Sequence, residues 1–458
     1  MITVDTGELA RLVDGRLHGA AEVRIRGVNT DSRKTLEQSL FVALRGERFD
    51  GHDFIGPDLE AAALLVERVV DDPRPQVVVS DTLEALAQLA SAWRDRSGAR
   101  VVALTGSNGK TTTKEMLRAI LARAGSVHAT QGNLNNHIGV PLTLLAMPPT
   151  ADYAVIEMGA NHAGEIARLT RWTRPHVALI TNAGRAHLDG FGSLEGVARA
   201  KGEIFEGLAD QGGTAVINLD DRFADYWLSL NRRHRCLGFS LEGKGEIHGV
   251  WREPDRLELC VQGARRELVL AVPGRHMAQN ALAAAAAASA LGCGTDTIVQ
   301  GLVVWRPVAG RLRAYRDASG ARVWDDTYNA NPESLAAALQ VLSAQEGIRV
   351  LVLGDMNELG HEAVALHAEM GQRARGMGIH HLLALGTMTP AAVDAFGKDA
   401  AWFPDHAELL PALRELLRPG TAVLVKGSRS QHMEDILTGL DLQPDGSTEG
   451  VADAVGAG

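Results

Sequence analysis

The sequence predicts an α/β protein of three domains, and three observations lead to this prediction. The chain has 458 residues, and roughly 150 residues per domain gives about three domains. A short apolar run at 100–105 enters a glycine-rich turn and then a helical pattern, as expected of a buried parallel strand that precedes a helix. After Gly310, short apolar runs again alternate with helical segments, which indicates a further doubly wound domain.

The first predicted domain covers residues 1–95 and is small and mixed. Strand-like runs are followed by a helical pattern, at 39–44, 62–66, 76–80 and 82–94 respectively. The polar stretch 95–99 is expected to be a linker.

The central predicted domain covers 96–309 and has a mostly parallel sheet. Its elements are strands at 100–105, 152–158, 177–181 and 214–218, short antiparallel strands within 234–272, and a helix at 276–291. The third, Rossmann-like domain covers 310–458, with strands at 323–324, 349–353, 382–385 and 422–425. Its tail from residue 443 is rich in Gly, Ala and Asp and is expected to be frayed.

Bulk composition argues against several classes of protein. The net charge of -10 disfavours nucleic-acid binding, which uses basic surfaces. Cys236, Cys260 and Cys293 show no metal spacing and are expected to be free thiols. The start of the chain lacks the pattern of a secretory signal, and the alanine-rich run 278–291 is too short to span a bilayer. We therefore expect no membrane insertion and a cytoplasmic location.

The strongest local signal is the segment TGSNGKTTT, residues 105–113. Glycines let backbone N–H groups approach phosphate oxygens, and the helix N-terminus favours negative charge. Lys110 can reach the β- and γ-phosphates of a nucleotide, and a threonine hydroxyl can bind Mg²⁺. The loop is shorter than the usual phosphate loop, and a plain glycine turn is the alternative. The predicted nucleotide-binding residues are Gly106, Ser107, Asn108, Gly109, Lys110, Thr111 and Thr112.

Three side chains elsewhere in the central domain are candidates for a metal site. Glu157 ends a predicted strand, where α/β sheets bind ligands, so its carboxylate is a candidate for Mg²⁺. His187 follows the next strand and is as readily structural as functional. Lys201 lies on a predicted helix, where a solvated surface lysine is the ordinary interpretation. A protonated lysine has no lone pair to give to a metal.

Taken together, the motifs resemble the Mur ligase superfamily over nearly the whole chain. The matching segments are NTDSRK (29–34), LFVALRGERFDGHDF (40–54), TGSNGKTTTKEM (105–116), QGNLNNHIGVPLTLL (131–145), EMGANHAGEI (157–166), NAGRAHLDGFGS (182–193), KGEIF (201–205), DDTYNANPES (325–334), LGDMNELG (353–360) and VLVKGSRSQHME (423–434). Three of these segments, GNLNNHIGVPL, EMGANH and DDTYNANP, resemble those of one branch of the superfamily. The members of that branch add a dipeptide to a UDP-linked precursor. The first domain would then bind the UDP substrate, the second ATP and Mg²⁺, and the third would close over the site.

The resemblance also implies roles for individual residues. Thr111 and Glu157 would hold one Mg²⁺, and His187 with a carbamylated Lys201 would hold a second. Asn280 would contact adenine, Arg311 the γ-phosphate and Asp326 the ribose, with the neighbouring Asp325 an open alternative for the ribose. The implied catalytic residues are Lys110, His187, Lys201 and Arg311. The implied substrate-binding residues are Asp31, Ser32, Arg33, Asn135, Asn136, His137, Asn329 and Asn331.

The implied reaction is ATP-dependent ligation of D-alanyl-D-alanine to UDP-N-acetylmuramoyl-tripeptide through an acyl phosphate, by a monomer. The third residue of the tripeptide, lysine or meso-diaminopimelate, stays open. Closure would use Pro307–Gly310 as a hinge. The alternatives are another Mur-type ligase, a folylpolyglutamate synthetase-like enzyme and, in a different class, a P-loop kinase or nucleotide-regulated binding protein.

Overall fold

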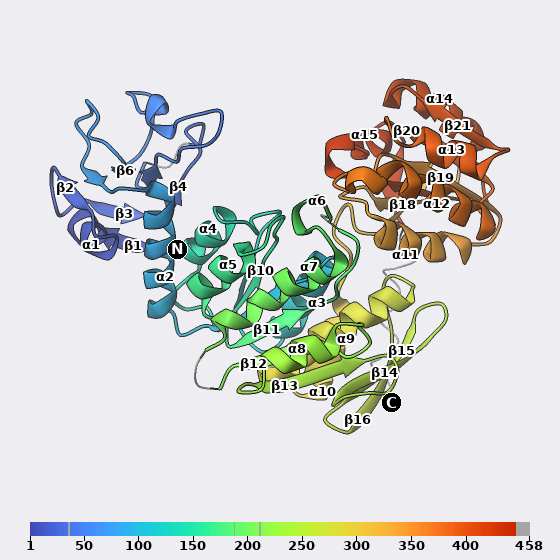
Figure 1. Ribbon diagram of the computed structural model, residues 1–458, viewed down its shortest axis with the longest axis horizontal. Coiled ribbons are helices and arrows are strands. Elements are labelled where there is room, and N and C mark those ends of the chain that lie inside the picture. The colour runs from blue at the N-terminus through green and yellow to red at the C-terminus, as the bar shows by residue number, and fades with distance from the viewer. Residues whose placement is uncertain (35–36, 187, 210–211, 446–458) are drawn as a thin grey trace.

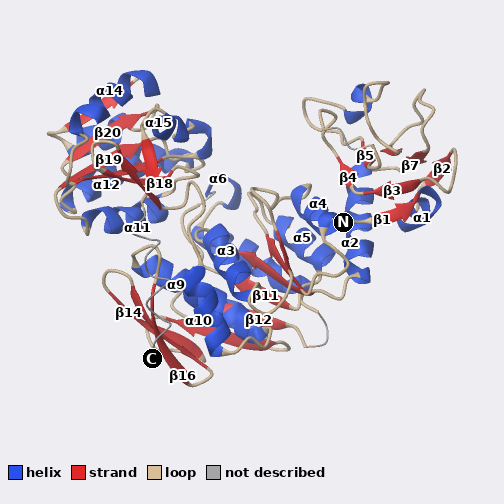
Figure 2. Ribbon diagram, turned by 180° about the vertical axis from the view of Figure 1, so that it is seen from behind, coloured by secondary structure: helices blue, strands red, loops and turns tan. Residues whose placement is uncertain are grey.

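The computed structural model forms three α/β lobes that follow one another along the chain, each with its own sheet (Figure 1). The structure describes residues 1–34, 37–186, 188–209 and 212–445. The N-terminal and C-terminal lobes lie at opposite ends of the central lobe, as both ribbon views show (Figures 1 and 2). The predicted α/β class is confirmed, whereas the exact domain bounds stay a prediction.

The N-terminal lobe combines a five-stranded sheet of order β2-β7-β6-β5-β4 with a two-stranded sheet, β1-β3. Its elements are β1 (Thr3–Asp5), α1 (Thr6–Leu12), β2 (Arg16–His18), β3 (Arg24–Arg26), β4 (Val28–Asn29), β5 (Leu40–Val42), η1 (Gly51–Phe54), β6 (Ala63–Val66), β7 (Gln76–Val78) and α2 (Thr82–Arg96). The segment 95–99 does not behave as a free linker, because Ser97 and Ala99 are buried. Helix α2 packs on the central lobe, where Trp93 Nε1 donates to the Met147 carbonyl at 3.0 Å.

The central lobe has a nine-stranded sheet of order β16-β15-β14-β13-β12-β11-β8-β10-β9. Its strands are β8 (Arg100–Thr105), β9 (Val127–Ala129), β10 (Tyr153–Glu157), β11 (Val177–Ile180), β12 (Thr214–Asn218), β13 (Arg235–Ser240), β14 (Ile247–Arg252), β15 (Arg256–Val261) and β16 (Ala264–Val269). The stretch 234–272 is only partly antiparallel, as β13 is parallel to both β12 and β14. Helix α8 (Ala224–Leu230) lies between β12 and β13 in the chain, and this crossover brings β13 back in the direction of β12.

Helices cover both faces of the central sheet. They are α3 (Lys110–Leu121), α4 (Gly139–Ala146), α5 (Glu165–Thr173), α6 (Leu188–Phe191), α7 (Leu194–Gly202), η2 (Glu203–Gly207), α8 (Ala224–Leu230), α9 (Arg275–Ala290) and α10 (Thr295–Val304). Alternate residues of β8 face opposite ways: Leu104 joins the core beneath α3 and α9, and Ala103 joins the core beneath α4 and α5. The alanine-rich α9 is almost wholly buried in the first of these cores.

In the described part of the chain, no helix combines the length and apolar character needed to cross a membrane.

The C-terminal lobe has a seven-stranded sheet of order β21-β20-β19-β22-β18-β17-β23. Its elements are β17 (Arg313–Asp317), β18 (Arg322–Asp326), α11 (Pro332–Ser343), β19 (Ile348–Leu353), η3 (Gly360–Glu362), α12 (Ala363–Gly376), β20 (His381–Leu385), α13 (Pro390–Phe396), β21 (Ala400–Phe403), α14 (His406–Leu416), β22 (Thr421–Lys426), η4 (Arg429–Gln431), α15 (Glu434–Thr438) and β23 (Leu442–Pro444). The strands β18, β19, β20, β21 and β22 are parallel to one another. At one edge of the sheet, β17 pairs antiparallel with both β18 and β23.

The prediction of a frayed tail from residue 443 is wrong for its first residues. Strand β23 pairs with β17, and the buried Asp445 accepts hydrogen bonds from Arg316 and Arg322 at 3.2 and 2.7 Å. Two arginines that meet one buried carboxylate hold this part of the tail on the sheet. Residues 446–458 lie outside the described residues.

Candidate functional site

The phosphate loop lies at the switch point of the central sheet. It follows β8, whose two neighbours are β10 and β11, and open α/β sheets bind ligands where the strand order reverses. The loop after β11 holds it in place. Ser107 N donates to the Asn182 carbonyl at 3.0 Å, and Asn108 N donates to Asn182 Oδ1 at 2.9 Å.

Two positions in the loop admit only glycine. Gly109, with φ 78°, precedes the first residue of α3, and a Cβ there would overlap Oδ1 of Asn280. Gly106, with φ 149°, approaches the Thr181 side chain so closely that a Cβ would overlap Oγ1. The left-handed backbone and the missing side chain both follow from the need to pass close to neighbouring groups.

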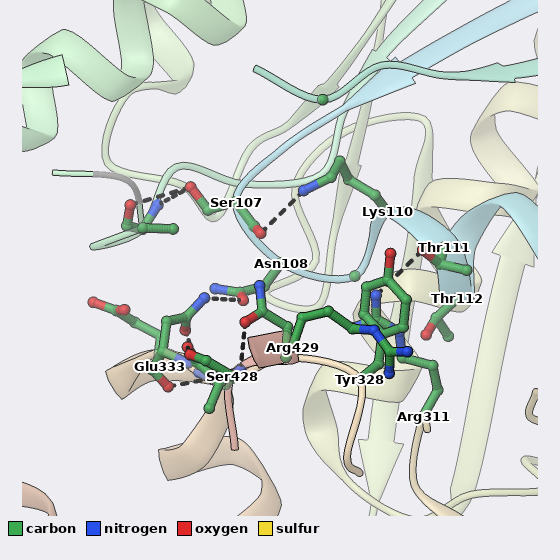
Figure 3. A pocket seen from close by; sticks show the side chains of 18 of the residues that line it. Ser107, Asn108, Lys110, Thr111, Thr112, Arg311, Tyr328, Glu333, Ser428 and Arg429 are labelled. Atoms are coloured by element: carbon green, nitrogen blue, oxygen red, sulfur yellow. Dashed lines mark hydrogen bonds between the residues drawn. The ribbon is translucent and has the colours of Figure 1, made fainter. Parts of the chain in front are cut away.

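A cavity of about 1010 Å³ opens in front of this loop, between the central and C-terminal lobes. The wall that the central lobe contributes contains residues 107–112. Lys110 Nζ donates to the carbonyls of Gly106 and Ser107 at 2.7 and 3.3 Å, so its ammonium lies along the loop (Figure 3). Burial lowers the pKa of Lys110, because the charged ammonium is less well solvated in the cavity wall than in water. In this position the ammonium would neutralise the charge of bound phosphates.

Arg311 reaches the phosphate loop from the beginning of the C-terminal lobe. Its Nη2 donates to Thr111 Oγ1 at 3.4 Å, and its guanidinium lies 4.1 Å from the ring centroid of Tyr328 (Figure 3). Its Nε is buried and has no hydrogen-bond partner. The cation is therefore held in the cavity by stacking, with a donor available to an anion.

The structure separates the roles of the adjacent acids Asp325 and Asp326. Asp325 is used internally, as it accepts from Gly310 N at 2.7 Å and from Thr327 Oγ1 at 2.7 Å. Asp326 lines the cavity and forms a buried ion pair with Lys426, at 2.5 Å between Oδ2 and Nζ. The pair follows from the parallel register, in which these two residues are opposite each other on β18 and β22. Of the two acids, Asp326 is the one placed to meet a ligand.

Glu157, at the end of β10, has a carboxylate whose two oxygens differ. Oε1 accepts from Asn135 Nδ2 at 2.9 Å, whereas Oε2 is buried and has no hydrogen-bond partner. A buried carboxylate oxygen without a partner is costly, and a divalent cation would satisfy it. Among the described residues, no group of three or more His, Cys, Asp or Glu side chains is arranged to hold a metal ion.

The surface interpretation of Lys201 is wrong. The side chain lies near the end of α7 and is 1% exposed, because Val197, Ala198 and Ala200 of the same helix pack into the core. Its Nζ lies 5.2 Å from the ring centroid of Phe191. Burial, reinforced by the charge of Lys110, lowers the pKa of Lys201 to about 7. His187 lies outside the described residues.

The predicted substrate-binding residues fall in two places. Asn135, Asn136 and His137, from the loop before α4, and Asn329 and Asn331, from the loop after β18, all line the cavity. Asp31, Ser32 and Arg33 lie in the N-terminal lobe and are not among its lining residues. Arg33 donates to Asp31 Oδ1 at 2.8 Å, and this bond lowers the pKa of Asp31 to about 2.

Several cavity residues were not predicted from the sequence. They include His276, Tyr328, Glu333, Lys426, Ser428 and Arg429. Lys426 ends the apolar run TAVLVK, which is the same strand-end signal that identified Glu157. Both ring nitrogens of His276 are buried without a partner, and burial lowers its pKa to about 4, so the imidazole is neutral near pH 7.

Comparison with known families places all three lobes in one family. The Mur ligase middle domain matches residues 104–288, the Mur ligase glutamate ligase domain matches 310–429, and the Mur ligase family catalytic domain matches 24–94.

Individual relatives are similar over nearly their full length. UDP-N-acetylmuramoyl-tripeptide–D-alanyl-D-alanine ligase of Escherichia coli is 44% identical, over 96% of this chain and 99% of that protein. The Bacillus subtilis ligase of the same name is 36% identical, over 97% and 100%. A crystal structure of MurF from Acinetobacter baumannii covers 96% of this chain and 98% of its own at 38% identity, with a TM-score of 0.91. MurF from Thermotoga maritima, solved in complex with ADP, has a TM-score of 0.80 at 30% identity, covering 90% and 96%. The chain therefore belongs to the Mur ligase family, within the branch of the MurF ligases.

Proposed function

We propose that this protein joins D-alanyl-D-alanine to UDP-N-acetylmuramoyl-tripeptide at the expense of ATP, in the cytoplasm and as a monomer. One observation carries the proposal: Arg311 and Asp326 of the C-terminal lobe line the same cavity as the phosphate loop. The match to ligases of that name runs through all three lobes. The UDP moiety is assigned to Asp31, Ser32 and Arg33, and domain closure to a hinge at Pro307–Gly310.

ATP is assigned to the cavity between the two lobes. Its phosphates would meet residues 106–112 and Arg311. Its adenine would meet Asn280, which lies against Gly109, and its ribose would meet Asp326. The ADP complex of the Thermotoga maritima relative supports a nucleotide site in this fold. The peptide end of the UDP substrate and the dipeptide are assigned to the asparagine-rich walls, Asn135 to His137 and Asn329 with Asn331.

The first chemical step converts a poor acyl donor into a reactive one. An oxygen of the terminal carboxylate attacks the γ-phosphorus, the bond to the β–γ bridging oxygen breaks, and ADP leaves. Both reactants are anionic, so this step needs fixed positive charge. Lys110, Arg311 and the backbone N–H groups of the loop supply it without reorganisation.

In the second step the uncharged amine of D-alanyl-D-alanine attacks the carbonyl carbon of the acyl phosphate. The tetrahedral intermediate expels phosphate, and the nitrogen loses a proton, which leaves an amide. Water is the competing nucleophile. The C-terminal lobe covers one side of the cavity, and exclusion of water would protect the acyl phosphate.

The residues present fit a divalent cation. Thr111 and Glu157 would hold one Mg²⁺, and His187 with a carbamate on Lys201 would hold a second. Bound Mg²⁺ would neutralise charge on the phosphate oxygens during transfer. A lysine whose pKa is about 7 has a substantial neutral fraction near pH 7, and only the neutral amine can add to CO₂. Burial of Lys201 therefore supports the proposed carbamate.

Phosphate release tests the proposal when the UDP-tripeptide and the dipeptide are added singly and together to enzyme, ATP and Mg²⁺. Release that requires both, with a UDP-linked pentapeptide in the mass spectrum, is expected. Release that is independent of D-alanyl-D-alanine would move the function to another ligase or a kinase. Lys110→Ala should abolish release and leave binding of the UDP substrate intact. Arg123→Ala, at an exposed residue just after the same helix, is the control.

A further inference from the structure

The second lysine of the segment TGSNGKTTTK is Lys114, one helical turn after Lys110 on α3. Its side chain is among the largest that are fully buried, with 2% exposure. A buried ammonium costs several kcal/mol unless it is paired, and lysines are seldom found there. A lysine on a solvent-facing helix would be exposed. The burial of Lys114 must therefore be explained by the groups that its side chain contacts.

Three oxygens surround the Lys114 ammonium. Nζ donates to the Thr130 carbonyl at 2.7 Å and lies 3.1 Å from Glu115 Oε1. It lies 4.0 Å from Glu157 Oε2, the carboxylate oxygen that is buried without a hydrogen-bond partner. The first two contacts anchor the ammonium, and the third places its charge beside the proposed cation ligand.

Thr130 connects the same lysine to Glu157 a second time. Its Oγ1 accepts from the Glu157 backbone N at 2.9 Å, while its carbonyl accepts from Lys114. Thr130 is 2% exposed, so neither bond has water as a ready substitute. Both the backbone and the carboxylate of Glu157 therefore depend on the Lys114 position.

We propose that Lys114 is a positioning residue that orients Glu157 for a divalent cation. At 4.0 Å the ammonium is too far from Oε2 to donate a hydrogen bond to it. The ammonium therefore attracts the carboxylate electrostatically and leaves that oxygen free to bind a metal ion. Glu115 offsets the charge of Lys114, which limits repulsion of the incoming cation. This inference rests on the proposed function, because it takes Glu157 as a cation ligand.

The test measures cation binding at equilibrium, without turnover. Mn²⁺ is titrated into the full-length enzyme with saturating ADP, and free Mn²⁺ is followed by electron paramagnetic resonance. In Lys114→Met, an apolar side chain of similar length removes the charge and the Thr130 bond. We expect Mn²⁺ to bind about tenfold more weakly, which corresponds to roughly 1.4 kcal/mol, with unchanged binding of the UDP substrate. Arg123→Ala, an exposed residue just after α3, is the matched control.

A second pair of variants keeps the proposal testable if Lys114→Met does not fold. Thr130→Val removes the acceptor for Glu157 N at nearly constant volume and should weaken Mn²⁺ binding, whereas Thr130→Ser should restore it. Unchanged Mn²⁺ affinity in Lys114→Met or Thr130→Val would overturn the proposal. Equal weakening of Mn²⁺, ADP and UDP-substrate binding would also overturn it, because that pattern indicates a purely structural lysine. The ligase proposal fails separately, through absence of pentapeptide with the wild-type enzyme.

Discussion

Asn331 Nδ2 donates a hydrogen bond of 2.7 Å to Asn108 Oδ1 and so joins the C-terminal lobe directly to the phosphate loop. The same asparagine caps α11, since its Oδ1 accepts from Ser334 N at 2.8 Å. One side chain thus fixes the start of a helix and its distance from the loop. Arg185 adds a further link between the lobes, with Nε at 2.9 Å from Glu333 Oε1.

Asn331→Ser separates these two functions of Asn331. Serine is as good a helix cap as asparagine, but it is too short to reach Asn108. We expect kcat/KM for ATP to fall about two- to tenfold, the value of one net hydrogen bond, with the free energy of unfolding nearly unchanged. Asn108→Ala should give a similar loss, and the double variant should be no worse than either single one. Additive losses in steady-state kinetics would show that the bond does not couple the lobes.

Replacement of Lys426 by methionine should destabilise the C-terminal lobe. The change leaves Asp326 buried without its cation, and breaking a buried ion pair costs about 3–5 kcal/mol. Urea denaturation measures the loss. In the double variant Lys426→Met with Asp326→Asn the unpaired charge is gone, so most of the stability should return. A loss below about 1 kcal/mol in Lys426→Met would contradict a buried pair.

Gly109→Ala should weaken nucleotide binding. The added Cβ would overlap Asn280 at a backbone φ of 78°, so both the loop and the predicted adenine contact must move. Gly263→Ala is the control for backbone strain alone, as Gly263 has φ 81° and open space around it. We expect at least a tenfold rise in the dissociation constant for ADP (about 1.4 kcal/mol) in the first variant, and none in the second. Equal effects in calorimetry would refute the packing argument.

Carbamate formation on Lys201 should depend on pH in the neutral range. Its pKa is lowered to about 7, so the reactive neutral amine is already half populated there and is lost as the pH falls further. An ordinary lysine reaches this point only near pH 10. With ¹³C-labelled bicarbonate, a carbamate resonance should appear as the pH rises through 7 and should be missing in Lys201→Arg. Appearance only above pH 9 would show that the amine is not perturbed.

Local patterns in the sequence predicted the elements that are wholly buried. Strands β8 and β12 span the runs 100–105 and 214–218 that the sequence indicated, because the inner residues of a parallel strand covered on both faces are apolar. The glycine-rich loop was equally predictable, because glycine is required where the backbone passes too close to its neighbours for a side chain. The direction of β13 was not, since strand pairing depends on the whole sheet and not on the strand itself.

The candidate site was predictable where one residue acts alone, and less so where two distant residues meet. Lys110 was identified from the glycine-rich loop, and Glu157 from the end of its strand. The Asp326–Lys426 pair joins residues 100 apart through the register of two strands, and burial of Lys201 follows from helix packing on the sheet. The tail at 443–445 looked polar and frayed, but Arg316 and Arg322 provide the partner charges for Asp445.

The central claim is that the carboxylate of the UDP-tripeptide takes the γ-phosphoryl group of ATP before the dipeptide attacks. It is tested most directly with UDP-N-acetylmuramoyl-tripeptide in which both oxygens of the terminal carboxylate are ¹⁸O. In the presence of ATP, Mg²⁺ and D-alanyl-D-alanine, the account predicts that each inorganic phosphate released contains one ¹⁸O from that carboxylate, in step with the pentapeptide formed. Phosphate without ¹⁸O, alongside pentapeptide, would contradict an acyl phosphate on the path to the amide.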